Sequence, residues 1–262
     1  MKLVRKNTVF QILLFAVIMV GLGALFYYNS VNLGYRWQWY RIPRYIITRD
    51  NGGILVPGAL AKGLGVTLLI SFISLIFANI IGLLTAILRL SSSFAGRLTA
   101  KVYLELVRNT PLLIQILFTY FVLAPLFGMS PFFSAVISLS LFEGAYTSEI
   151  IRGGILAVPQ GQWESAYSLG LSTLDTYRYC IIPQTFRQIL PPLASQSVSL
   201  IKDSALVSTI AIYDLTMAGQ AIISKTFLTF EIWFVVALVY LAVTIPISVV
   251  IRSMEKRISY EN

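Results

Sequence analysis

Acidic side chains lie inside long apolar segments of this sequence, where a charge is costly unless it faces a partner or a water-filled cavity. Glu149 has Arg152 three residues further on, a spacing that favours an ion pair on one helix face. Glu143 has no basic residue one turn away, so its alternatives are a place on a solute path and burial at a helix contact. For Asp203, which directly follows Lys202, the alternatives are a path lining and a salt-bridged structural kink.

The residue types that most enzymes use are scarce in this chain. It has no histidine and a single cysteine, Cys180, which excludes an internal disulfide and a Cys/His metal cluster. No G-x-x-x-x-G-K-[ST] phosphate loop occurs, so the chain is not itself a nucleotide hydrolase. We therefore expect no catalytic residues, no metal site and no cofactor.

Composition indicates a membrane protein. Hydrophobic residues make up 57% of the 262 positions, charged residues 12%, and the mean hydropathy is +0.79. The net charge of +9 could suggest a nucleic-acid partner, but the basic residues flank the apolar runs instead of forming one aromatic-studded patch. We expect contact with membrane lipid and no nucleic acid.

The apolar runs predict an all-α integral membrane protein with six transmembrane helices, because about 20 apolar residues are needed to cross a bilayer. The expected helices are 9–28, 63–88, 112–126, 132–151, about 193–212 with a break at Pro191-Pro192, and 230–251. An amphipathic stretch, 97–108, is expected along the inner surface, and Thr110 and Pro111 are expected to cap and start the third helix.

Charge distribution predicts that both termini lie inside. Thirteen of the twenty Lys and Arg then fall on the inner side, although the aromatic and basic segment 29–62 runs against the trend. The first run could be a signal peptide, but it is long and ends in Phe26-Tyr27-Tyr28 without a small-residue cleavage site. We therefore interpret it as a membrane helix.

The second expected helix carries small residues three or four positions apart along one face. Such a face permits close contact with another helix. Its members are Gly63, Thr67, Ser71, Ser74, Ala78, Gly82 and Ala86.

A polar loop, 152–187, interrupts the apolar runs. It predicts two short helices that meet at Gly170, the first with Glu164 in its first turn, where a carboxylate suits the helix dipole. Ser172 and Asp175 have the spacing of a capping box, and Pro183 is expected to stop the second helix. We interpret the loop as a docking element.

Residues of this loop resemble the EAA motif of permease subunits of ABC importers: Glu-Ala-Ala, three residues, Gly, nine residues, Ile-x-Leu-Pro. Glu164, Ala166, Gly170 and Pro183 match in register, and Ser165 replaces the middle Ala. Two further positions depart from the pattern, Cys180 for Ile and Ile182 for Leu. The resemblance implies that this segment is a coupling helix that receives the motion of a separate ATPase. The coupling residues that it implies are Glu164, Ser165, Ala166, Gly170 and Pro183.

Three further segments resemble the polar amino-acid branch of these permeases, within a resemblance that covers about 63–251. They are R-N-T-P-L-L-I-Q at 108–115, A-Y-T-S-E-I at 145–150 and I-K-D-S at 201–204. The resemblance implies the type I importer fold. Within these segments we place Tyr146, Lys202, Asp203 and Ser204 on the translocation path, with a structural kink as the alternative for the last three. Glu143 is outside these signatures. We place it on the path only because it lies about halfway along its apolar segment.

The resemblance also implies partners and a location. We expect ABC ATPase subunits, a second permease subunit that is identical or related, an outer solute-binding protein, an amino-acid substrate and the bacterial cytoplasmic (inner) membrane. The expected domains are 1–62, a permease core 63–251 and a cytoplasmic tail 252–262. The competing hypothesis is an ion- or proton-coupled secondary transporter using Glu143 and Asp203; the lack of a second half that echoes the first counts against it.

Overall fold

The computed structural model describes residues 2–50 and 52–260, and the side chains of 10–50 and 52–255. It divides into two compact units, 1–40 and 41–262. The first unit is the long helix α1 (Lys2–Asn32) followed by an aromatic segment in which Trp37 and Trp39 stack with ring centroids 5.8 Å apart. Residues 10–32 of α1 are long and apolar enough to cross a membrane. The basic side chains of Lys2, Arg5 and Lys6 lie outside the described residues.

The second unit is a bundle of helices with one small hairpin. After the 3₁₀ turn η1 (Trp39–Arg41) come α2 (Pro43–Ile46), β1 (Ile47–Arg49) and β2 (Leu55–Pro57), the strands antiparallel with Thr48 opposite Val56. This hairpin lies in the segment where only a polar and aromatic surface was expected. The main helices are α3 (Ala59–Leu90), α4 (Phe94–Arg108), α7 (Pro131–Leu156), α10 (Ile182–Asp203), α11 (Leu215–Thr226) and α12 (Thr229–Tyr260).

The small-residue face of α3 is buried along its whole length, as predicted. All seven of its members are buried, and α3 packs most extensively against α7. A Cβ atom added to Gly82 would overlap the side chain of Thr147 on α7, and one added to Gly63 would come within 2.9 Å of Ala218 on α11. Close approach of backbones therefore holds α3 in the centre of the second unit.

Helices α4 and α5 (Leu112–Phe118) are joined by a sharp bend of 104°. The π-helical turn η2 (Thr119–Leu123) and α6 (Ala124–Phe127) continue from α5. The prediction that Thr110 caps this helix is wrong by one position: Pro111 is the N-cap, and Thr110 instead donates its hydroxyl to the carbonyl of Leu106.

Helix α10 is continuous, so the predicted break at Pro191-Pro192 is wrong. Prolines are tolerated inside membrane helices where neighbouring helices and local adjustments satisfy the backbone groups they free. The helical geometry changes only at Ser204, where the 3₁₀ turn η4 (Ser204–Ile210) begins and runs to Ala211, which has a left-handed backbone. Helix α11 was not expected; Asp214 caps it by accepting a hydrogen bond from the Met217 amide at 2.8 Å.

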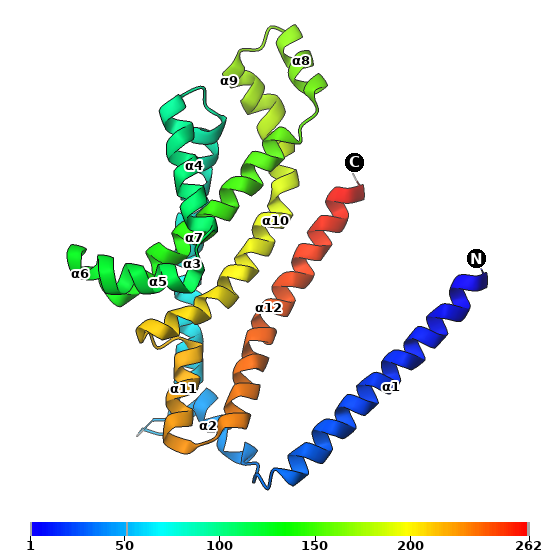
Figure 1. Ribbon diagram of the computed structural model, residues 1–262, viewed down its shortest axis with the longest axis vertical. Helices are drawn as coiled ribbons and strands as arrows, with labels where there is room; N and C mark the ends of the chain where they lie inside the picture. The colour runs from blue at the N-terminus through cyan, green and yellow to red at the C-terminus, as the bar shows by residue number, and fades with distance from the viewer. Residues whose placement is uncertain (1, 51, 261–262) are drawn as a thin grey trace. The chain divides into compact units, whose positions relative to one another are not determined.

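Among the described residues the two largest apolar clusters lie in the second unit. One gathers residues of α3, α5, α7, α10 and η4 around Ile70, Ile116 and Leu139, and the other joins α2, α3, α11 and α12 around Leu60 and Ile232. Within this unit the short helices α8 (Gln160–Ser168) and α9 (Thr173–Asp175) lie at one end, and α2 lies at the opposite end (Figure 1).

Three described helices are long and apolar enough to cross a membrane, or up to five if each bent pair counts as one span. The three are within α1, α3 and α12, and the bent pairs are α4 with α5–α6 and α9–α10 with α11. The helical membrane fold is therefore confirmed. The count of six and the inner position of both termini stay predictions.

Candidate functional site

The docking loop has the two short helices that its sequence predicts. Helix α8 starts after Pro159, Gly170 adopts a left-handed backbone with φ of +77°, and the Ser172 hydroxyl accepts from the Asp175 amide at 3.2 Å to start α9. The expected position of Glu164 is wrong: α8 begins at Gln160, so Glu164 lies one turn further along. Its carboxylate accepts a hydrogen bond from the Gln160 side chain at 2.8 Å.

Pro183 does not stop the second helix. The π-helical turn η3 (Thr176–Ile181) follows α9 directly, and Pro183 lies in the first turn of α10. The first turn of a helix does not need the amide proton that proline lacks, so the chain passes from η3 into α10 without a break. The docking loop is therefore joined to α10 by continuous helical backbone.

Packing holds the docking loop together while leaving an apolar surface free. Ala166 is 2% exposed, and the rings of Trp163 and Tyr177 meet edge to face at 5.1 Å. Glu164 and Ser165 are exposed. Four large side chains beside them are exposed as well, which is unusual unless a partner covers them: Tyr167, Leu169, Leu174 and Tyr179.

Two carboxyl groups come together between α7 and α10. Glu143 is 1% exposed, and its Oε2 accepts a hydrogen bond from Nε2 of Gln196. Its other oxygen, Oε1, has no side-chain or backbone donor that meets hydrogen-bond geometry. Asp203 is close enough for the two carboxyl groups to interact. The structure thus pairs the two acids that sequence analysis placed on the path.

The other expected path residues do not join this pair. Lys202 lines a separate pocket of about 330 Å³ between α10 and α12, and the structure has no ion pair between it and Asp203 among the described side chains. Ser204 is fully buried and donates its hydroxyl to the Ile201 carbonyl at 2.8 Å. Tyr146 lies about one turn along α7 from Glu143, and its ring is tilted against that of Phe142 with the ring centroids 5.1 Å apart.

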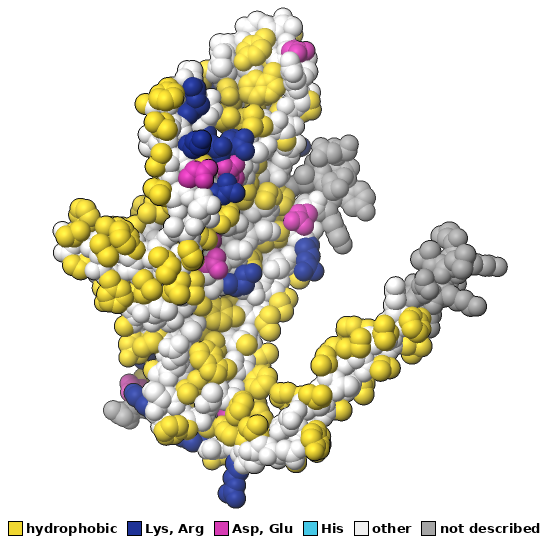
Figure 2. Space-filling view, viewed as in Figure 1, with side chains coloured by type: hydrophobic (Ala, Val, Ile, Leu, Met, Phe, Trp, Pro, Cys, Tyr) yellow, Lys and Arg dark blue, Asp and Glu magenta, His cyan; other side chains and the backbone are white. Residues whose placement is uncertain are grey.

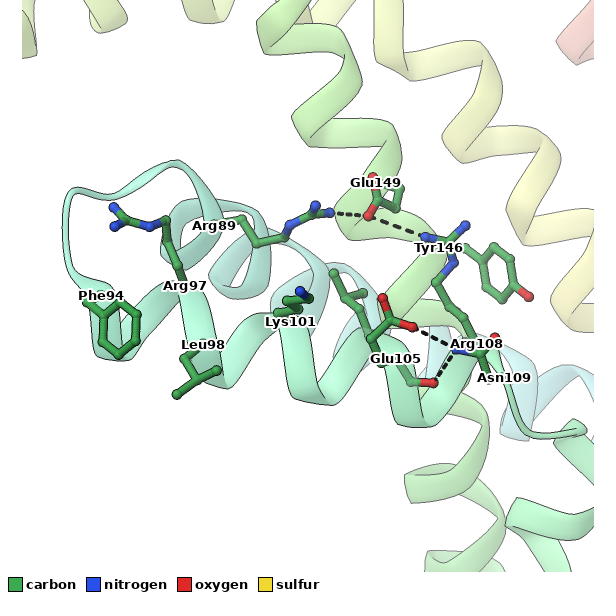
Figure 3. Close-up of a pocket in the computed structure, with 11 residues that line it drawn as sticks. Arg89, Phe94, Arg97, Leu98, Lys101, Glu105, Arg108, Asn109, Tyr146 and Glu149 are labelled. Carbon is green, nitrogen blue, oxygen red and sulfur yellow. Dashed lines mark hydrogen bonds and ion pairs between the residues drawn. The ribbon is translucent and has the colours of Figure 1, made fainter.

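Glu149 is the centre of an ion-pair cluster. Its carboxylate is 2.9 Å from the Arg152 guanidinium, as the spacing predicts, and it also pairs with Arg89 from the end of α3 and with Arg108 from the end of α4 at 3.4 Å. The Arg108 guanidinium lies 5.9 Å from the Tyr146 ring centre. The Glu149 carboxylate on α7 therefore forms ion pairs with side chains of both α3 and α4 (Figure 3).

This cluster forms one wall of a basic pocket of about 820 Å³, which we call the α4 pocket. Figure 2 shows its Lys and Arg side chains gathered on the face where α4 lies in Figure 1. The charged groups that line it are Arg89, Arg97, Lys101, Arg108, Glu105 and Glu149.

Sequence reasoning missed Gln196 and the partners of Glu149 on α3 and α4. A signal for Gln196 existed, because it lies seven residues before Asp203 and hence on the same face of α10. No local pattern links Arg89 or Arg108 to Glu149, since 60 and 41 residues separate them.

Known proteins similar to this chain are membrane transport components. A family model described as "binding-protein-dependent transport system inner membrane component" matches residues 78–260. The glutamine transport system permease protein of Escherichia coli strain K12 is 38% identical over 201 residues, 76% of this chain and 92% of that protein. The L-cystine transport system permease protein TcyB of Bacillus subtilis strain 168 is 40% identical over 202 residues, 76% of this chain and 86% of that protein.

Solved structures agree with these relatives. A crystal structure of an amino acid ABC transporter with histidines is 37% identical, with a TM-score of 0.72 over 76% of this chain and 94% of that one. An inward-facing structure of the MetNI methionine ABC transporter is 16% identical, with a TM-score of 0.60 over 74% of this chain and 95% of that one, which is a likeness of fold alone.

Proposed function

Since the chain belongs to the family of binding-protein-dependent transport system inner membrane components, we propose that it is the permease subunit of an ATP-driven importer of polar amino acids. It is a transport component of the inner membrane and not an enzyme, and its family works with an ATPase and a solute-binding protein. The relatives named for glutamine and cystine transport support the substrate class.

The observation that carries the substrate class is the carboxyl pair formed by Glu143, which is buried, and Asp203, which is partly buried. An amino acid brings an ammonium group into the membrane, and a carboxylate in a low-dielectric site is a strong partner for it. Glu143 has one oxygen held by Gln196 and one oxygen without a donor, which leaves it able to accept from a solute. Within this proposal Tyr146 on α7, Lys202 on α10 and Ser204 at the start of η4 flank the path and do not contact the ammonium.

The second part of the proposal is that the docking loop couples the permease to its ATPase. Glu164, Ser165 and Ala166 form the middle of α8, Gly170 turns the chain between the short helices, and Pro183 starts α10. The exposed apolar side chains around them suit a protein groove, because contiguous apolar surface usually marks an interaction site. Residues 63–251 would form the permease core, with 1–62 and 252–262 as additions to it.

Reconstitution tests this function. The chain is purified with its candidate ATPase and incorporated into liposomes, and uptake of each of the twenty amino acids is measured with the solute-binding protein present. We expect uptake of one or a few polar amino acids that requires ATP and stops when the ATPase carries a disabled phosphate loop. Uptake driven by a proton or sodium gradient without nucleotide would support the secondary-transporter hypothesis instead.

A further inference from the structure

We propose that the α4 pocket binds the headgroup of an anionic phospholipid. The site goes beyond the proposed transport function, and it rests on that function only for the position of the pocket in the membrane. Three residues separate the end of α3 from the start of α4, and the 32 residues of α3 span about 48 Å at ~1.5 Å per residue, which exceeds a hydrocarbon core of about 30 Å. The start of α4 and the last turn of α3 therefore lie at a membrane boundary.

Charge in the pocket is unbalanced in favour of an anion. Four basic side chains and two acidic ones line it, and Glu149 is already shared by Arg89, Arg108 and Arg152. Arg97 and Lys101 make no ion pair with the acidic side chains that the structure describes. Two cations are therefore available to a ligand without disturbing the Glu149 cluster.

Both cations belong to α4 and line the same pocket. Arg97 and Lys101 are four residues apart on α4 and so occupy one face, and both line the pocket (Figure 3). The Arg97 guanidinium donates to the Ser91 carbonyl at 2.9 Å, which holds it toward the end of α3. A phosphodiester between them would receive charge-assisted hydrogen bonds from both.

An apolar stripe on the same helix identifies the anion as a lipid. Phe94, Leu98, Val102 and Leu106 recur every four residues and are 74%, 49%, 49% and 64% exposed. This stripe lies beside the basic face, and two of its members, Phe94 and Leu98, line the pocket itself. A helix with a basic face and an apolar face at a membrane boundary matches an anionic headgroup and its acyl chains at once. A free phosphate would leave the stripe without a function.

The test measures lipid retention by the purified full-length chain. Native mass spectrometry and apparent melting temperature are recorded in detergent with added phosphatidylglycerol or phosphatidylcholine. We expect phosphatidylglycerol to be retained and to raise the melting temperature, while phosphatidylcholine does neither. The double variant Arg97→Gln/Lys101→Gln should bind phosphatidylglycerol more weakly by about fivefold for each lost cation.

A matched control removes the same charge elsewhere. Lys62→Gln/Lys225→Gln changes two exposed lysines that line a different pocket, between α3 and α11, and should retain phosphatidylglycerol as the parent does. The proposal is overturned if both lipids act alike, if the Arg97/Lys101 variant binds like the control, or if inorganic phosphate gives the same stabilisation as the lipid.

Two other results are also decisive. A disulfide-linked dimer through Val102→Cys in a Cys180→Ala background would show that a second copy covers the stripe, and would overturn the proposal. Retention of phosphatidylglycerol is measured without ATP or amino acid, so a chain that retains it but fails to transport would refute the proposed function and leave the lipid site standing.

Discussion

Gln196 on α10 donates a hydrogen bond to the buried carboxyl group of Glu143 on α7, across a separation of 53 residues in the sequence. An amide can supply only a neutral partner, so this contact orients Glu143 without neutralising it. With Asp203 next to it on the α10 side, the pair has two carboxyl groups and makes no ion pair with a Lys or Arg side chain among the described residues, although Lys202 is near enough to act electrostatically on Asp203. A cationic group of a solute is the complement that such a pair lacks.

Glu143→Gln should change which amino acids compete for uptake while the protein still inserts and binds its ATPase. The substitution keeps the size and a hydrogen-bonding partner for Gln196 but removes the charge. Uptake competition by unlabelled basic, neutral and acidic amino acids in proteoliposomes measures the effect. We expect the apparent affinity for the preferred amino acid to weaken by about tenfold or more, since a charged hydrogen bond contributes about 1.5–3 kcal/mol.

The control for this prediction is Glu231→Gln, which changes another fully buried carboxyl group, on α12. It should leave the competition profile as it is. If Glu143→Gln has the profile and rate of the parent, Glu143 is a buried helix contact and does not border the path.

Gly82→Leu should lower the yield and the apparent melting temperature of the protein in detergent. Even a Cβ atom at this position overlaps Thr147, and helix association in membranes depends on packing. Overpacking of this kind costs about 1–3 kcal/mol. Gly65→Leu on the same helix is the matched control, because nothing lies within 4 Å of its added Cβ atom. Equal behaviour of the two variants would contradict a close α3–α7 contact at Gly82.

Glu149→Gln should destabilise the protein, because three guanidinium groups lose their shared carboxylate. The carboxylate is 22% exposed, so we expect a loss of about 1–3 kcal/mol, less than for a fully buried pair. Arg89→Gln should lower the free energy of unfolding by less in the Glu149→Gln variant than in the parent, because the Arg89–Glu149 ion pair is already absent there. A double-mutant cycle on thermal unfolding measures the coupling, and strictly additive losses would show that the two side chains do not interact.

Glu164→Lys should abolish uptake and leave insertion unchanged. Glu164 is exposed and its side chain accepts a hydrogen bond from Gln160 within α8. We therefore expect a reversed charge at this position to leave the folded structure unchanged. Ser165→Ala, which restores the small residue of the EAA pattern beside it, is the control and should transport normally. Both are compared at equal membrane abundance by uptake and by co-purification of the ATPase. Normal uptake by Glu164→Lys would remove Glu164 from the coupling contact.

The parts of the fold that local sequence dictates were predicted well. The small-residue face of α3 and the left-handed turn at Gly170 depend on residue size and spacing within one segment, and both are present. The Glu149–Arg152 ion pair follows from spacing on one helix in the same way. These features need no knowledge of the rest of the chain.

Features that depend on tertiary context were missed or misplaced. Pro183 was expected to end a helix and Pro191-Pro192 to break the start of one, but the cost of a missing amide proton is low in a first turn and is offset by surrounding helices further along. The start of α8 was placed one turn late because Gln160 carries no strong capping signal. The contact of Arg89 with Glu149 arises from helices brought together by folding, which local spacing does not encode, whereas the spacing of Gln196 and Asp203 on α10 gives only the shared face and not the contact with Glu143.

Helix α10 connects the docking loop to the carboxyl pair through continuous helical backbone. Its 22 residues run from the turn after α9 to Asp203, about 33 Å at ~1.5 Å per residue. If α10 rotates as a rigid body about its docking end, a tilt of about 10° displaces Asp203 by about 6 Å, given that length. A movement of that size exceeds the reach of a hydrogen bond, so a small rotation at one end is enough to separate Asp203 from Glu143 at the other.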